Sequence, residues 1–126
     1  MKRLFRVTSA IKQTLVHQTS DLNVTTCNVT LLTNSGIIRA TKYGKLLIVD
    51  GYVTISGQNE NKNVEIAKIN GIVLKQQTTQ FLAQIGNAPI SPYCTFGSMR
   101  DDGTIVVYSP LNSDSLFRFG FATITR

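Results

Sequence analysis

The sequence predicts an all-β fold, either a sandwich or a barrel of antiparallel strands. Short runs rich in Val, Ile, Thr, Phe and Tyr recur about every ten residues, separated by clusters of Gly, Pro, Asn, Asp and Ser. No convincing helix follows residue 20, whereas an α/β fold needs crossover helices between its parallel strands. The length of 126 residues fits one domain that buries its own core, so we expect residues 1–126 to form a single domain.

The strand pattern of the sequence is strongest in eight segments. In chain order they are 22–32, 45–49, 52–55, 64–69, 79–85, 91–99, 104–109 and 116–125. Between the second and third of these, Asp50-Gly51 is either a two-residue hairpin turn or a bulge within one long strand. Residues 1–20 are ambiguous, because Ser9 would cap a helix there while a pair of strands fits the same segment equally well.

The C-terminal segments have the most specific local pattern. The sequence Arg-Asp-Asp-Gly at 100–103 predicts a tight hairpin, because Asp-Gly supplies the positive φ angles that such a turn requires. The last segment places Phe117, Phe119 and Phe121 on one face, and its other face is apolar too, so we expect a strand in the centre of the sheet. In the segment 79–85, Leu82 interrupts an otherwise regular alternation of apolar and polar residues.

Composition and charge restrict the classes of partner. Charged residues make up 16% of the chain, below the ~25% usual for globular domains, and uncharged polar residues are abundant. Such a composition suits a β-sandwich surface that contacts other subunits or glycans. The net charge of +6 invites a nucleic-acid interpretation, but most basic residues are scattered singly and are not interleaved with aromatics. No apolar run approaches the ~20 residues that span a bilayer, so we expect no membrane insertion.

No pattern of catalytic or metal-ligating residues stands out. Cys27 and Cys94 lack the spacing of a zinc site, and the single histidine, His17, is too little support for a catalytic triad. The glycines form neither a dinucleotide-binding nor a Walker A motif. We therefore expect a non-enzymatic protein with no metal and no cofactor. The two cysteines would either pair in an oxidising compartment or remain buried thiols.

Residues 43–126 resemble the C-terminal head domains of tail fibre and receptor-binding proteins from phages and prophages of Gram-positive bacteria. The resemblance rests on Tyr43 followed by GKLLIVDGYVTISG, on VEIAKING, on the hairpin motif DGTIVV that begins at Asp102, and on the closing LFRFGFATITR. It implies an antiparallel β-sandwich or jelly roll, usually trimeric, that recognises host surface carbohydrate from the tip of a virion tail. Residues 43–126 would then be the head-like core, and residues 1–20 an N-terminal extension or a trimer contact.

The candidate ligand-binding residues come from loops and from tyrosines. Loop Asn and Asp side chains suit the hydroxyls of a glycan, and tyrosine combines an apolar ring with a hydroxyl. The candidates are Arg100, Asp101, Asp102, Asn112, Asp114, Tyr93 and Tyr108. The expected protein is a homotrimeric receptor-binding head, exposed on the virion, that binds host glycan or other virion proteins; nucleic acid is not expected. The alternatives are a structural virion assembly or decoration protein and a basic single-strand nucleic-acid-binding barrel.

Overall fold

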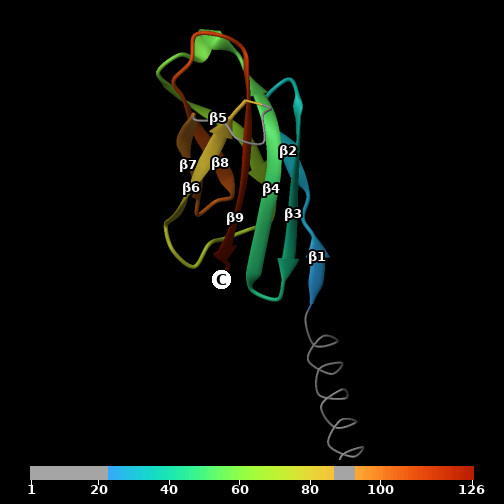
Figure 1. Ribbon diagram of the computed structural model, residues 1–126. Helices are drawn as coiled ribbons and strands as arrows, with labels where there is room; N and C mark the ends of the chain where they lie inside the picture. Colours follow the sequence, from blue (N-terminus) through green and yellow to red (C-terminus); the bar gives the residue numbers. More distant parts are fainter. Residues whose placement is uncertain (1–22, 87–92) are drawn as a thin grey trace, which may run out of the picture.

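The alternating segments of the sequence form an all-β architecture. The structure is a computed structural model, and it describes residues 23–86 and 93–126. Within these residues lie nine strands and one turn of 3-10 helix, η1 (Figure 1). In chain order they are β1 (Val24–Thr26), β2 (Val29–Leu31), β3 (Gly36–Tyr43), β4 (Leu46–Ile55), η1 (Gly57–Asn59), β5 (Lys62–Ile69), β6 (Thr78–Ile85), β7 (Cys94–Arg100), β8 (Thr104–Ser109) and β9 (Ser115–Ile124). The expected all-β class is confirmed, and the expectations for residues 1–20, including His17, lie outside the described residues.

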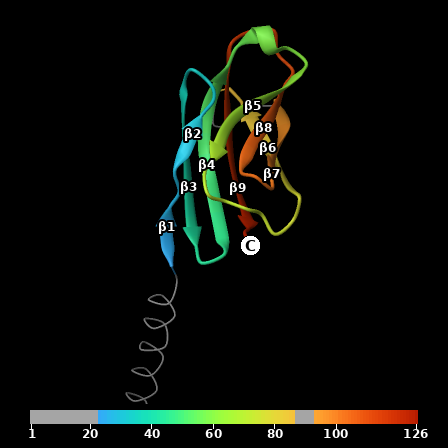
Figure 2. The ribbon, with the colours of Figure 1, turned by 180° about the vertical axis from the view of Figure 1, so that it is seen from behind.

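The strands form one antiparallel sheet that curls into two layers. The strand order is β1-β3-β4-β9-β6-β7-β8-β5-β2. Figures 1 and 2 show β3, β4 and β9 on one side of the molecule and β5, β6, β7 and β8 on the other. The two layers meet at β6, which pairs with β9 only over residues 83–85 but with β7 over residues 78–84. Each layer therefore has one face turned towards the core and one outer face.

β1 and β2 are two halves of a strand that joins the opposite edges of the sheet. β1 pairs with β3, whereas β2 pairs with β5 (Figure 2). At the break, the Cys27 amide donates to the Ala40 carbonyl, and the Asn70 amide donates to the Asn28 carbonyl, both at 2.9 Å. The sequence predicts one strand over 22–32. Two are formed because the chain changes its pairing partner as it passes from one edge to the other.

β4 is a single uninterrupted strand. It pairs with β3 and with β9 without a register shift, so Asp50-Gly51 is neither a hairpin turn nor a bulge. A Cβ on Gly51 would lie 2.2 Å from the Ile37 carbonyl oxygen, so glycine is needed because β3 approaches closely. β1 and β3, which lie before or up to residue 43, belong to the same sheet as the later strands, so the sheet starts at β1.

Phenylalanine rings fill the corner between the two layers. Phe119 is buried and Phe121 is half-buried, and both rings stack on Phe81, with centroid distances of 5.1 and 4.5 Å. Gly97 lies opposite Phe81 in the β6–β7 pair, where a Cβ would be 2.5 Å from the Phe81 Cζ. The missing side chain of Gly97 thus makes room for the Phe81 ring. These contacts hold β6 against β9 beyond the residues at which the two strands pair.

The expected central position of the last strand is confirmed, because β9 lies between β4 and β6. Its inner face is buried at Phe117 and Phe119. Its outer face is exposed at Gly120, Ala122 and Ile124, and Ile124 is 44% accessible. Both faces of this strand therefore carry apolar residues, but the described chain buries only the inner face and leaves the outer face open.

We expect Gly97→Ala to lower the free energy of unfolding by about 1–3 kcal/mol, as overpacking of a dense core does. The new Cβ would meet the Phe81 ring and also the Val106 carbonyl oxygen, 2.8 Å away, so both a side chain and the backbone have to shift. Urea unfolding measures the change. Ser98→Ala, at the next position of β7, is the control and should stay within about 0.5 kcal/mol of the parent chain. Equal stability of Gly97→Ala and the parent would contradict this account of the corner.

Candidate ligand-binding groove

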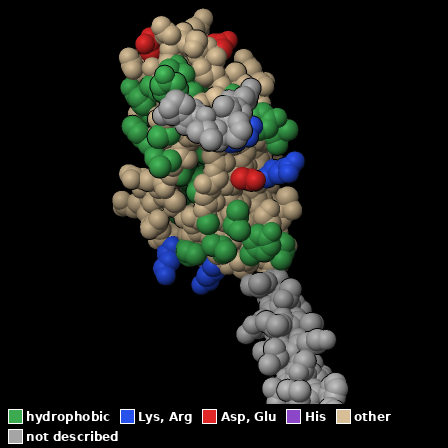
Figure 3. All heavy atoms as spheres, viewed as in Figure 1, with side chains coloured by type: hydrophobic (Ala, Val, Ile, Leu, Met, Phe, Trp, Pro, Cys, Tyr) green, Lys and Arg blue, Asp and Glu red, His purple; other side chains and the backbone are tan. Residues whose placement is uncertain are grey.

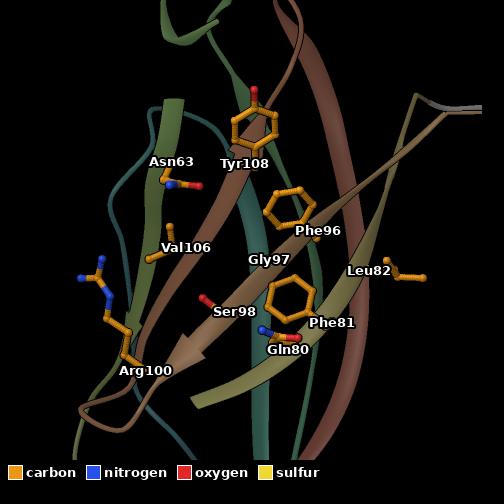
Figure 4. A pocket seen from close by; sticks show the side chains of 10 residues that line it. All are labelled: Asn63, Gln80, Phe81, Leu82, Phe96, Gly97, Ser98, Arg100, Val106 and Tyr108. Carbon is orange, nitrogen blue, oxygen red and sulfur yellow. The ribbon is translucent and has the colours of Figure 1, made fainter. Parts of the chain in front are cut away.

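A groove lies on the outer face of the layer formed by β5, β6, β7 and β8. Its volume is about 560 Å³, within the size range of small-ligand sites. Figure 4 shows the side chains that line it. Outer-face residues alternate along each strand and lie opposite one another across the strand pairs, so the lining falls into two rows that cross the layer, with Arg100 beyond the second.

The first row is an apolar ridge with an aromatic centre. Leu82 lies opposite Phe96, and Tyr108 lies opposite Asn63. The Phe96 and Tyr108 rings are parallel, with an interplanar angle of 2° and centroids 5.3 Å apart, and Figure 4 shows them next to each other. The Tyr108 hydroxyl donates to Asn61 Oδ1 at 3.1 Å, which fixes the orientation of its ring. Leu82 and Phe96 are 70% and 59% exposed, so the ridge offers open apolar surface to a ligand.

The second row is the floor of the groove. Gln80, Ser98 and Val106 lie opposite one another on β6, β7 and β8, and Glu65 on β5 ends the row. Val106 is buried and Ser98 is half-buried, so the floor lies lower than the ridge. It presents an amide and a hydroxyl beside the aromatic rings, and both groups donate and accept hydrogen bonds.

Arg100 forms the far side of the groove. Its Nη1 donates to Glu65 Oε1 at 2.9 Å, and the two side chains are about half exposed. An exposed ion pair of this kind contributes little to stability, but it orients the guanidinium beside the floor. This bond engages one of the five N–H donors of the guanidinium, so donors remain that can face a ligand.

The arrangement is suited to binding a polar, uncharged ligand. The aromatic ridge provides apolar contact, the floor and rim provide hydrogen-bonding groups, and the charge of Arg100 is offset by Glu65. In residues 23–86 and 93–126, no group of three or more His, Cys, Asp or Glu side chains is placed to hold a metal ion. None of the described segments is a helix long and apolar enough to cross a membrane. Cys27 and Cys94 are both free thiols, half-buried and exposed respectively.

Of the seven residues predicted from the sequence, Arg100 and Tyr108 lie in the groove. Tyr93 is 67% exposed just before β7 and does not line it. The structure does not bring the seven residues together. The predicted loops that contain the other four lie at opposite ends of β8, one before Thr104 and the other after Ser109.

The carboxylates predicted in the first of these loops serve the turn between β7 and β8. Asp102 Oδ1 accepts a hydrogen bond from the Thr104 amide at 2.9 Å. The Asp101 carbonyl accepts one from the Leu74 amide at 3.1 Å, which ties the turn to the loop before β6. Both residues are exposed, and neither lines the groove.

The residues predicted in the second loop hold η1 in place. Asp114 Oδ1 accepts a hydrogen bond from the Gly57 amide at 2.9 Å. The Asn112 carbonyl packs against Gly57 so closely that a Cβ there would lie 2.3 Å from its oxygen. These contacts give Asn112 and Asp114 a role in joining the loop before β9 to the end of β4.

Sequence reasoning missed most of the groove. The missed residues that line it on the outer face are Asn63, Gln80, Leu82, Phe96, Ser98 and Val106. One signal was visible, because Leu82 is apolar at a position where the alternation of its segment requires a solvent-facing residue. The others come together only through the registers of three strand pairs, which the sequence does not specify.

Comparison of the chain with models of known protein families found no match, and a search of curated proteins found none either. The function therefore has to be inferred from the groove together with the resemblance in sequence.

We expect Asp102 to contribute to the pH dependence of stability. The hydrogen bonds from the Thr104 amide and the Thr104 hydroxyl hold the pKa of Asp102 below its ordinary value. A carboxyl with a lowered pKa stabilises the fold above its unfolded pKa, and that contribution is lost as the pH falls through the folded pKa. Asp102→Asn should therefore be less stable than the parent at neutral pH and lose less stability on acidification below about pH 4.

Differential scanning calorimetry between about pH 2 and pH 7 measures this effect. Asp101→Asn is the matched control, because the side chain of Asp101 takes no part in the bonds with Thr104. If Asp102→Asn and the parent chain lost stability in parallel throughout that range, the hydrogen bonds from Thr104 to Asp102 would not be a cause of the pH dependence of stability.

Proposed function

We propose that this chain is a non-enzymatic, glycan-binding head domain of the phage tail fibre or receptor-binding type, and that host saccharide binds in the groove over β7 and β8. The observation that carries the proposal is the exposed pair of parallel rings, Phe96 and Tyr108, beside a low polar floor. The sequence resemblance supports the biological setting, at the tip of a virion tail facing the external medium.

A saccharide suits this groove for two physical reasons. The C–H face of a sugar ring packs on aromatic and aliphatic side chains, which the ridge of Leu82, Phe96 and Tyr108 supplies. The sugar hydroxyls donate to and accept from the amide of Gln80 and the hydroxyl of Ser98. Affinity at one such open site is expected to be low. Display of several copies on one virion, as in the trimer that the resemblance implies, would raise the overall affinity through avidity.

The groove is less suited to a nucleic acid than to a sugar. A polyanion gains affinity from unpaired basic side chains, through release of counterions. In the described part of the groove the one guanidinium, that of Arg100, is already paired with Glu65. Binding of single-stranded nucleic acid should accordingly be weak. A purely structural virion protein should bind neither glycan nor nucleic acid.

Phe96→Ala tests the groove, because this ring is 59% exposed and its removal should leave the fold intact. We expect the variant to bind polysaccharides purified from Gram-positive cell walls at least about tenfold more weakly than the parent, a loss of ~1.4 kcal/mol. A polysaccharide array identifies the binding glycans, and isothermal titration calorimetry on those glycans measures the dissociation constants.

Tyr93→Ala is the matched control, since Tyr93 is at least as exposed as Phe96 and lies outside the groove. It should bind as the parent does. Loss of binding in Tyr93→Ala but not in Phe96→Ala would assign recognition to the loop before β7 and reject the groove. Absence of binding to every polysaccharide would reject the glycan proposal. Binding to an oligothymidylate that weakens steeply with added salt would favour the nucleic-acid alternative.

A further inference from the structure

Large hydrophobic side chains cluster on the outer face of β1, β3, β4 and β9, at the end where β4 begins and β9 ends. Val24 lies opposite Tyr43. Tyr43 lies opposite Leu46, which lies opposite Ile124, so one apolar row crosses four strands, and Ile48 lies in the next row. These five side chains, which we call the apolar patch, are between 38% and 57% exposed. Figure 3 shows hydrophobic side chains gathered at the lower end of the molecule.

The apolar patch is large enough to mark a contact surface. It holds five of the eleven large hydrophobic side chains that are exposed in residues 23–86 and 93–126. Contiguous exposed patches of this kind mark contact sites, whereas single exposed apolar residues are ordinary. A hollow of about 470 Å³ extends the patch beyond β9, and it is lined by Lys75, Gln76, Ala122, Thr123 and Ile124. The hollow has room for large side chains of the segment or molecule that covers the patch.

Residues 1–22 join the described chain at the edge of the apolar patch. The Gly44 amide donates to the Asn23 carbonyl at 2.9 Å, which fixes the backbone at the point of entry beside β3. The next residue, Val24, begins β1 and belongs to the patch. A segment tethered at this point has an effective concentration over the patch on the order of millimolar, well above that of a separate molecule at micromolar concentration.

The composition and length of residues 1–22 suit the apolar patch. The segment contains seven Leu, Ile, Val or Phe residues, which are Leu4, Phe5, Val7, Ile11, Leu15, Val16 and Leu22. Four strands spaced about 4.8 Å apart are about 14 Å across. About ten helical residues or about five extended residues span this distance, so the segment is long enough in both of the conformations that the sequence leaves open.

The other segment outside the described residues, 87–92, is attached at the opposite end of the sheet. The Gly86 amide, just before it, donates to the Leu116 carbonyl at 2.8 Å. Leu116 and Ile124 are eight residues apart on β9, which corresponds to about 26 Å. Six residues extend over about 20 Å at most, and these six have to return to β7. Residues 87–92 are therefore too few to cover the patch.

We propose that residues 1–22 fold back over the apolar patch of their own chain and bury it with their hydrophobic side chains. The segment then closes the lower part of the layer that contains β3, β4 and β9, and the protein presents the groove of the other layer to its ligand. This inference does not depend on glycan binding. It is compatible with the trimer that the resemblance implies, because the segment takes up only the lower part of one layer.

Apolar contact rather than charge drives this packing. Lys45, Lys75 and Arg126 lie around the patch, where backbone hydrogen bonds join the start of β4, the end of β9 and the loop before β6. Residues 1–22 contain four Lys or Arg residues and one Asp, so they too are basic. Added salt screens the repulsion between like charges, and it should therefore leave the patch covered or cover it more completely.

Hydroxyl-radical footprinting of the full chain, read by mass spectrometry, tests the proposal. Leu46 in the patch is 39% exposed in the described structure, and Leu32 near η1 is 49% exposed, so the two leucines should react at similar rates if nothing else covers them. We expect Leu46 to react severalfold more slowly than Leu32 in the parent. The combined substitution of Ile11→Asp and Leu15→Asp should raise the rate at Leu46 towards that at Leu32, because it places two carboxylates in the covering segment.

Ser20→Asp is the matched control, since it adds a carboxylate to the same segment without removing a hydrophobic side chain, and it should leave Leu46 protected. Circular dichroism verifies that each variant folds. Equal reactivity of Leu46 and Leu32 in the parent would overturn the proposal, as would protection that the combined substitution does not reduce. Protection that is lost on dilution, together with dissociation in sedimentation velocity, would assign the cover to a second copy instead.

Discussion

The rings of Phe81, Phe119 and Phe121 determine how the two layers of this protein sit against each other. β6 pairs with β9 over only three residues, so the hydrogen bonds of the sheet do not by themselves fix the corner at which the layers diverge. The stacked rings fill that corner, and they fit because Gly97 has no side chain. The outer residues of β7 that line the groove and the outer residues of β9 on the opposite layer are both positioned by this packing.

The sequence predicted most of the strands, because these depend on local alternation and on turn residues close by in the chain. The hairpin between β7 and β8 and the core face of β9 were found in this way. The sequence missed β3, since no strand was expected over residues 36–43. The split of the first strand into β1 and β2 was not predicted, because it follows from where the two edges of the curled sheet lie. The continuity of β4 through Asp50-Gly51 was not settled for a similar reason. Gly51 is needed because β3 approaches closely, which is a long-range contact. In the sequence, the same Asp-Gly pair looks like a turn.

The candidate site was predicted much less well than the fold. Asp102 and Asp114 were named as ligand-binding residues because polar loop side chains suit hydroxyls, yet each accepts a backbone hydrogen bond that shapes its own loop. The groove is built on strands instead. Phe96 and Tyr108 are brought side by side only when β7 and β8 adopt their register. Tyr108 was named because a tyrosine suits a wet contact surface, and Arg100 because it adjoins the predicted turn at 100–103. Phe96 was not singled out.

The split first strand also bears on how the protein avoids aggregation. An exposed edge strand invites pairing with strands of other molecules, because its amide and carbonyl groups lack partners. In this fold β1 covers the end of β3, and β2 covers the end of β5, each with only three residues. Strands so short offer little backbone to an incoming chain. The segment 24–31 therefore closes the sheet and also limits its growth at the rim.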